Sequence, residues 1–301
     1  MRKGMRLSSL ALVSLLASVS AQAKFAPEND LYKEDDLFSR SANMTQNDFN
    51  LIINNIVEQY KPLAQKHGGS LSSNNKWTDG TVNASAEQQS MGTRWIVNMY
   101  GGLARRPEVT PDGFAMVVCH ELGHHFGGYA YYEGGDWAAA EGQADYFATH
   151  ACARKIWKGQ KDINAKSRDT VNPTAKAKCD ASWASVEDQD LCYRTANASY
   201  SLAVLLQKLG GEADVSFDKA DPAVVSVTDS AHPAAQCRLD TYVNGSICTT
   251  GFDENIIPGR KFPDGQESKG AELESGKYTC MATKGNRVVG DRPLCWFAPL
   301  N

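Results

Sequence analysis

Residues Met116–His124 read MVVCHELGH and continue an apolar run that begins at Phe114. The run predicts a helix, because no proline interrupts it. His120 and His124 are four residues apart, so a helix places both imidazoles on one face. Glu121 lies about 100° round the helix from His120. Two imidazoles on one face, with a carboxylate beside them, favour a zinc site with a nearby general base.

Such a site needs a third protein ligand. In one class of HExxH site this ligand is a histidine six residues after the second one, but residue 130 is alanine. In another class it is a glutamate from a following helix, and Glu141 with Asp145 supplies an ExxxD pair after His124. We predict that Glu141 binds the metal and that Asp145 accepts a hydrogen bond from His120, which would fix the tautomer of that ring.

Two other acidic residues are alternatives to Glu141. Glu133 and Asp136 lie beside a pair of glycines, which indicates a turn rather than a rigid helical face, so Glu141 is favoured. His125 follows the motif but points away from the face that His120 and His124 share, which predicts a packing or surface role.

The N-terminus has the pattern of a secretory signal peptide. Three basic residues among the first six precede an apolar run at 10–19, and Ala21-Gln22-Ala23 fits a small-x-small cleavage site. The run is shorter than the ~20 apolar residues that span a bilayer. We predict that residues 1–23 are removed after Ala23, which gives a periplasmic or secreted chain without stable membrane insertion. An uncleaved anchor is the alternative.

Composition excludes several classes of protein. A charged share of 22% excludes a disordered or collagen-like polymer, and a hydrophobic share of 42% is enough to bury a core. The chain has a net charge of -4, and without the three basic residues of the signal peptide 28 basic and 35 acidic groups remain, a net of -7. This balance offers no general attraction to nucleic acid, so we expect none as a partner.

All eight cysteines follow residue 23, and an oxidising compartment favours disulfides over thiolate metal ligands. Spacing does not determine the connectivity, since eight cysteines allow 105 pairings. The shortest separations predict the pairs Cys179–Cys192, Cys237–Cys248, Cys280–Cys295 and, by remainder, Cys119–Cys152. The last pair would join the two proposed ligand helices, and buried free thiols are the alternative there.

Periodicity and turn residues predict further elements around the motif. Thr45 and Asp48 form a capping pair that opens a helix, and Gly68-Gly69 ends it. Asp79-Gly80 predicts a hairpin between two strands. The other expected elements are a loose lead-in at 24–44, strands at 71–77, 81–86 and 94–100, a helix at 136–156, a surface loop at 158–182, a helix at 185–210 and a loop-rich, disulfide-stapled end.

With these residues in this order, the chain resembles a gluzincin metallopeptidase. It is most similar to the family that contains the CAAX prenyl endopeptidases and their periplasmic bacterial relatives. The matching islands lie within residues 45–240 and are Val82-Asn83-Ala84, the strand and Gly-Leu turn from Arg94 to Leu103, HELGH, ExxxD, and His232-Pro233 followed by Arg238. The short gap between His124 and Glu141 departs from that family, and no transmembrane helices are present in the sequence pattern, so a prenyl substrate is not implied.

The resemblance implies an α+β, zincin-like metallopeptidase fold. This fold would have a small mixed sheet, an active-site helix, a third-ligand helix and one Zn²⁺ per chain. The expected organisation is a signal peptide at 1–23, a zinc metallopeptidase domain at 24–240, and a cysteine-containing C-terminal extension at 241–301 packed on the same domain.

The mechanism of such a site assigns roles to further residues. Glu121 would take a proton from a water activated by zinc and pass it to the leaving amine. His232 is the candidate second donor to the developing oxyanion, and Pro233 after it suits the first position of a helix. By resemblance His232 could instead cap the zinc, and a plain helix-cap role is the alternative. Arg238, on the same helix, is expected to anchor the loop to an acid.

The strand at 94–100 is the expected binding edge for substrate. An extended polypeptide would pair with the backbone of Val97, Asn98 and Met99, which would make the preference for sequence weak. An ordinary sheet edge is the alternative reading of this strand.

Together these patterns predict a secreted or periplasmic zinc endopeptidase that acts on polypeptides. One alternative is a noncatalytic, metal-stabilised protein that binds the cell envelope. Another is a zinc hydrolase that acts on peptidoglycan crosslinks. The sequence makes no prediction of the oligomeric state.

Overall fold

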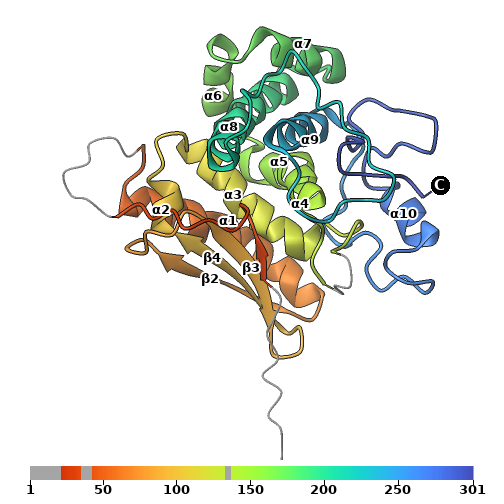
Figure 1. The fold of residues 1–301 in the computed structure, drawn as a ribbon, viewed down its shortest axis with the longest axis horizontal. Coiled ribbons are helices and arrows are strands. Elements are labelled where there is room, and N and C mark those ends of the chain that lie inside the picture. The colour runs from red at the N-terminus through yellow and green to blue at the C-terminus, as the bar shows by residue number, and fades with distance from the viewer. Residues whose placement is uncertain (1–21, 35–42, 133–136, 301) are drawn as a thin grey trace, which may run out of the picture.

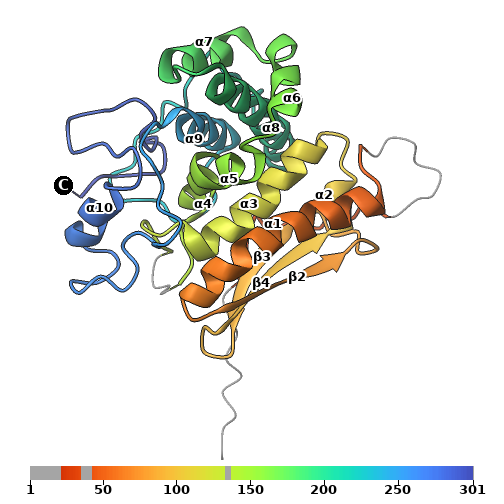
Figure 2. The same cartoon turned by 180° about the vertical axis from the view of Figure 1, so that it is seen from behind.

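The computed structural model describes residues 22–34, 43–132 and 137–300. In these ranges the chain is α+β with one small mixed sheet, which confirms that part of the prediction. Figures 1 and 2 show the sheet on one side, the long helices α1 (Gln46–Lys66) and α3 (Pro111–Phe126) packed on it, and most other helices beyond α3. No helix in the described ranges is long and apolar enough to cross a membrane. The predicted signal peptide lies outside these ranges except for its last two residues.

The sheet contains four strands in the order β1-β3-β4-β2. They are β1 (Gln22–Lys24), β2 (Ser70–Lys76), β3 (Ala84–Gln89) and β4 (Arg94–Tyr100). β1 and β4 each pair antiparallel with β3, whereas β2 pairs parallel with β4. α1 packs on β2, and α3 packs on β3 and β4, so almost every residue of the two central strands is buried.

The predicted hairpin at Asp79-Gly80 is wrong. β2 and β3 are not neighbours, because β2 follows α1, packs against it and pairs in parallel with β4. The Asp79 side chain instead closes a local turn, in which its carboxylate accepts a hydrogen bond of 3.0 Å from the Thr81 backbone N–H. The observed hairpin joins β3 to β4 through Ser90, Met91 and Gly92, all with positive φ.

The predicted binding edge is also wrong, because β4 is an interior strand. Val97, Asn98 and Met99 are buried and pair with β3 on one side and with β2 on the other. Their backbone groups are therefore used within the sheet and cannot add a substrate strand. The outer strands of the sheet are β1 and β2.

α3 is the central helix of the fold. Thr110 caps its N-terminus by accepting a hydrogen bond of 3.0 Å from the Gly113 backbone N–H. Every residue from Gly113 to Phe126 is buried, because the sheet and α1 cover one side and helices cover the other. The HELGH motif therefore lies in the interior of the molecule.

The helical layer differs from the prediction in several places. The helix expected from 136 begins at Glu141 as α4 (Glu141–Phe147) and continues through the π-helical turn Ala148–Cys152. The helix capped by Ser185 is present as α8 (Val186–Gly210), but residues 158–182 contain helices rather than only a loop. The remaining helices are α2 (Gly101–Ala104), α5 (Ala153–Trp157), α6 (Lys161–Ala165), the short 3-10 helix Lys166–Asp169, α7 (Pro173–Ser182), α9 (Ala235–Ile247) and α10 (Lys269–Ser275).

The lead-in expected at 24–44 is not loose where it begins. Phe25 and Ala26 directly follow β1 and are fully buried. Both belong to the main hydrophobic core together with α1 and α3. The sequence pattern did not predict this short buried segment, because the residues that follow it are mostly polar.

All eight cysteines are paired, as expected of a protein from an extracellular or periplasmic compartment. The predicted pairs Cys119–Cys152 and Cys179–Cys192 are confirmed. The other two predicted pairs are wrong, because the C-terminal region folds back along α9 and is tied to both of its ends. The observed bonds are Cys237–Cys295 and Cys248–Cys280.

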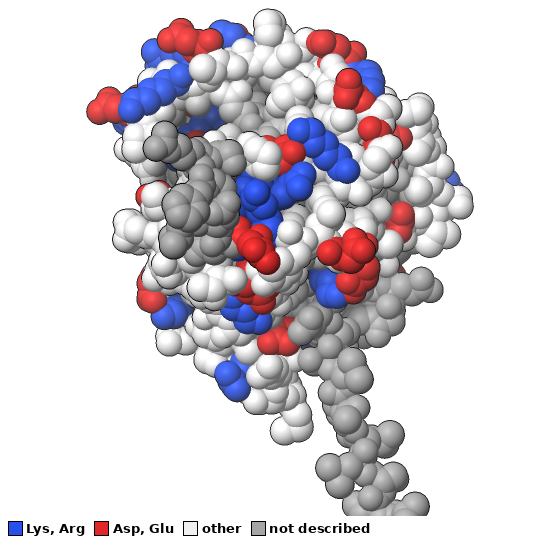
Figure 3. All heavy atoms as spheres, turned by 60° about the vertical axis from the view of Figure 1, so that its left-hand side comes forward, with Lys and Arg blue, Asp and Glu red and all other residues white. Residues whose placement is uncertain are grey.

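The surface drawn in Figure 3 mixes charges of both signs. Basic and acidic side chains lie beside one another there rather than gathering by sign. This face therefore presents no broad basic patch of the kind that binds nucleic acid.

The Cys119–Cys152 disulfide should stabilise the fold, because it closes a loop of 33 residues between α3 and the turn after α4. Replacing both cysteines with alanine is expected to lower the free energy of unfolding by about 2–5 kcal/mol, measured by urea denaturation without reductant. The Cys179→Ala, Cys192→Ala chain is the matched control, and its loss should be smaller because its loop has 13 residues. A Cys119→Ala, Cys152→Ala chain as stable as its parent would contradict this.

Candidate metal centre

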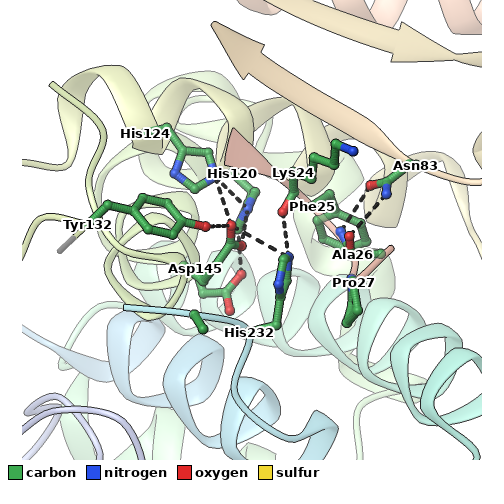
Figure 4. A network of polar contacts seen from close by, with 12 residues as sticks. Lys24, Phe25, Ala26, Pro27, Asn83, His120, His124, Tyr132, Asp145 and His232 are labelled. Atoms are coloured by element: carbon green, nitrogen blue, oxygen red, sulfur yellow. Dashed lines mark hydrogen bonds and ion pairs between the residues drawn. The ribbon is translucent and has the colours of Figure 1, made fainter. Parts of the chain in front are cut away.

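His120 and His124 of α3 and Glu141 of α4 meet in the interior, and all three are fully buried. One ligand atom from each lies within 4.8 Å of the other two. The Nε2 atoms of the histidines are 3.1 Å apart, and the Glu141 carboxylate lies 3.2 Å from His120 Nε2 and 3.6 Å from His124 Nε2. Figure 4 shows the two rings turned toward this common point. The three predicted ligands are therefore brought together.

A glycine allows the two ligand helices to approach. A Cβ atom at Gly123 would lie 2.8 Å from the Cα and carbonyl oxygen of Ala144 on α4, which is closer than side-chain atoms tolerate. The connecting segment returns alongside α3, and Ala139 N–H donates a 3.0 Å hydrogen bond to the His124 carbonyl. Gly123 and this return place Glu141, the first residue of α4, opposite the histidines.

The far nitrogen of each histidine has its own partner. His124 Nδ1 lies 2.7 Å from the Ala139 carbonyl oxygen, which only accepts, so Nδ1 carries the proton and Nε2 presents its lone pair to the centre. His120 Nδ1 lies 2.7 Å from Asp145 Oδ1. Arg238 donates to the same carboxylate, from Nε at 2.6 Å and from Nη2 at 2.7 Å. Carboxylate and carbonyl partners of this kind orient metal-binding histidines.

The charges of the centre favour one added cation. Burial lowers the pKa of His124 to about 4, so this ring is neutral. Burial also lowers the pKa of His120, but the carboxylates of Asp145 and Glu141 outweigh it and raise that pKa to about 9. Burial raises the pKa of Glu141, yet the histidines hold it below its ordinary value, so this carboxylate is ionised. A positive charge is therefore stable at the point where the three side chains meet.

Among the described residues, Glu121 has no hydrogen-bond partner for its side chain. Its side chain is fully buried, and among the described residues neither of its carboxylate oxygens has a hydrogen bond. Burial raises its pKa well above the ordinary value. Glu141 Oε2 lies 3.2 Å from His120 Nε2 in an ion-pair contact, but it accepts no hydrogen bond within the described part of the chain. Buried polar atoms normally have partners, so these oxygens indicate a site that takes up an ion and water.

The donor set fits a metal ion. His124 Nε2 presents a free lone pair, and His120 Nε2 presents one when a bound cation displaces its proton. Two imidazole nitrogens and one ionised carboxylate are ligands that divalent transition metals accept. The second observed cluster with metal-binding residue types, Asp221 with Cys237 and Cys295, does not qualify, because its two cysteines form a disulfide. The alternative third ligands Glu133 and Asp136 lie outside the described residues.

His232 lies at the rim of the centre. Its Nε2 is 3.5 Å from Glu141 Oε1 and 2.7 Å from the backbone carbonyl oxygen of Lys24. The expected helix position is wrong, because α9 begins at Ala235 with Ala234 as its cap, so Pro233 precedes the helix. His232 therefore projects from the segment before α9 and is not part of its first turn.

Tyr132 is a site residue that the sequence did not reveal. Its hydroxyl donates a hydrogen bond to Glu141 Oε1, and its ring centroid lies 6.0 Å from that of His124. The sequence feature that could have indicated it is its position in the short segment that connects α3 to α4, the two helices that carry the candidate ligands.

His125 behaves as its position on the helix predicts. Its ring stacks on Trp95 with centroids 5.4 Å apart and on Trp137 with centroids 5.1 Å apart. Its Nε2 lies 3.3 Å from the Ile96 carbonyl oxygen. His125 therefore packs between α3 and the sheet and takes no part in the ligand cluster.

Asp145→Asn should weaken metal binding without removing a ligand. The change removes the negative charge that orients His120 and pairs with Arg238, so the dissociation constant for Zn²⁺ is expected to rise about 10- to 100-fold. Competition with a chromogenic chelator measures it. Asp162→Asn, at an exposed position of α6, is the matched control and should bind as the parent does. Unchanged affinity in a folded Asp145→Asn chain would contradict the orienting role.

Comparison with known proteins adds no identification to this geometry. The chain matches no family model, no curated protein and no solved structure. The residues that indicate a function are a buried His-His-Glu centre, a glutamate beside it that has no hydrogen bond among the described residues, and a buried Asp-Arg pair behind it.

Proposed function

We propose that the chain is a zinc-dependent endopeptidase of the gluzincin type, with a zincin-like fold, that acts in the periplasm or outside the cell. The observation that carries the proposal is the buried centre of His120, His124 and Glu141 with Glu121 beside it. Four disulfides support an oxidising compartment.

Zinc is the metal that these residues suit best. Two histidines and one glutamate are the protein ligands of many catalytic zinc sites, which keep a further position open. Zinc bound there would supply a Lewis acid that polarises a carbonyl group and acidifies water. The paired cysteines leave no thiolate in this chain to form a softer site.

Glu121 is the residue that would move protons. It follows His120 on α3, yet its carboxylate has no hydrogen bond among the described residues, so it is free to take a proton from water. Burial raises its pKa, which favours holding that proton until a leaving amine accepts it. A nearby cation acts in the opposite direction and restores the ionised form.

Two neighbouring side chains can stabilise negative charge on a reacting carbonyl oxygen. His232 Nε2 lies 3.5 Å from Glu141 Oε1, and the Tyr132 hydroxyl donates a hydrogen bond to the same oxygen. Figure 4 shows the two side chains approaching the centre from different directions. Donors held in place beside the reacting atoms stabilise a developing oxyanion. The 2.7 Å contact between His232 and the Lys24 carbonyl supports a polypeptide substrate, because a peptide carbonyl fits at this donor.

Glu121→Gln tests the proposal, since it keeps the shape of the side chain and removes its ability to take a proton. We expect one zinc per chain, measured by atomic emission, and a fall of about 10²- to 10⁴-fold in kcat on unfolded casein or a fluorogenic peptide. Glu58→Gln, at an exposed position of α1, is the matched control and should keep full activity. Full activity in Glu121→Gln, or no zinc in the parent chain, would refute the peptidase.

The same assays separate the two alternative functions. A parent chain that holds zinc and cleaves neither casein nor purified peptidoglycan is a noncatalytic binding protein. Release of crosslinked fragments from peptidoglycan, with casein intact, identifies a hydrolase of the cell wall.

A further inference from the structure

An extended piece of the chain itself lies beside the candidate metal centre. β1 pairs antiparallel with β3, with Ala23 opposite Ala86 and Lys24 opposite Ser85. The pairing continues to the 3.2 Å hydrogen bond from Phe25 N–H to the Ala84 carbonyl. Figures 1 and 4 show this piece between the sheet and the helices that carry the ligands. Residues Gln22–Ala26 are called the N-terminal segment below.

Two successive carbonyl groups of the N-terminal segment are held by residues of the candidate site. The Lys24 carbonyl oxygen lies 2.7 Å from His232 Nε2, whose other neighbour is Glu141. The Phe25 carbonyl accepts a 2.5 Å hydrogen bond from Arg238 Nη1. The segment therefore occupies the donor that the proposed reaction would use for a substrate carbonyl.

The space that the Phe25 side chain fills in the core, called the Phe25 pocket below, lies next to the candidate metal ligands. It is fully buried, and its ring meets the His120 ring edge to face with centroids 5.3 Å apart. The Arg238 guanidinium lies over the same ring, 4.8 Å from its centroid. This environment suits a flat aromatic side chain, through ring contacts and a cation–π contact.

Asn83 recognises the backbone of the next residue. Its side chain accepts a 3.0 Å hydrogen bond from Ala26 N–H and donates one of 3.0 Å to the Ala26 carbonyl. Pro27 follows, which has no N–H and cannot extend a strand pairing. The N-terminal segment is thus held by main-chain hydrogen bonds and by one pocket for an aromatic side chain. Sheet edges bind peptides in the same way.

We propose that the N-terminal segment is an internal blocking peptide that occupies the substrate edge of β3. Peptide substrates bind in its place, antiparallel to β3, and place a large aromatic side chain in the Phe25 pocket. This inference rests on the proposed peptidase function. Since one edge of β3 accepts one strand, the segment and a substrate exclude each other. Cleavage after Ala23, as the sequence predicts, would remove Gln22 and Ala23 and leave Lys24–Ala26 as the blocking residues, with the held carbonyls of Lys24 and Phe25 in place.

The test is to release the segment after the chain has folded. A recognition sequence for a specific protease is inserted between Asp30 and Leu31, which are exposed. The folded, zinc-loaded chain is cut, the freed peptide is removed by gel filtration, and hydrolysis of a fluorogenic peptide is compared before and after. We expect kcat/KM to rise at least tenfold. The parent chain, treated with the same protease, is the control and should not change.

Synthetic peptides provide the second arm of the test. The peptide Lys24–Asp30 should inhibit the cut chain competitively, and the same peptide with Phe25→Ala should need at least tenfold more for equal inhibition. A peptide with Asp30→Ala, at an exposed position, is the matched control and should inhibit as the unchanged peptide does. Release of the segment without any gain in activity would overturn the inference. A segment that never exchanges with labelled peptide would also overturn it and would show that the segment is a permanent strand of the sheet.

A binding measurement separates this inference from the proposed function. Fluorescence anisotropy of labelled Lys24–Asp30 on the cut chain requires no catalysis. If the label binds and unfolded casein displaces it while no form of the zinc-loaded chain cleaves anything, the peptide edge is supported and the peptidase is refuted. If the cut chain cleaves casein but does not bind the label, the peptidase stands and the blocking peptide is refuted.

Discussion

The buried carboxylate of Asp145 is the interaction on which the rest of the site depends. It holds His120 Nδ1 at 2.7 Å and pairs with two nitrogens of Arg238, so it joins α3, α4 and α9 at one point. Burial opposes ionisation of Asp145, but Arg238 and His120 keep its pKa below the ordinary value. Removing one partner would leave an uncompensated charge in the interior, which is why such pairs constrain a fold strongly.

Arg238 also connects this pair to the edge of the sheet. The same guanidinium donates to the Phe25 carbonyl and lies over the Phe25 ring. The candidate metal ligands, helix α9 behind them and strand β1 beside β3 therefore form one continuous network. Disulfides at both ends of α9 tie that helix to the C-terminal region, so the position of Arg238 is supported from outside as well.

Local chemistry predicted the elements whose determinants are close in sequence. The capping box at Thr45 and Asp48 opens α1, and the spacing of His120, His124, Glu141 and Asp145 predicts which side chains share helical faces. Predictions from local sequence were wrong where the partner of a segment is distant in the sequence. Asp79-Gly80 has the residues of a hairpin turn, but β2 packs against α1 and lies on the far side of β4 from β3. The residues of the turn after β2 do not reveal that β2 pairs in parallel with a later strand.

The sequence by itself determined the candidate ligand set, because helical periodicity and residue type specify which side chains with nitrogen or carboxylate atoms share a helical face. Only the tertiary structure decided what surrounds them. Tyr132 above Glu141, Phe25 against His120, and His232 on the Lys24 carbonyl are contacts between segments that are separated in the chain or joined by an irregular connection. Such contacts follow from how helices and strands pack, and packing is a property of the whole folded chain rather than of any short pattern.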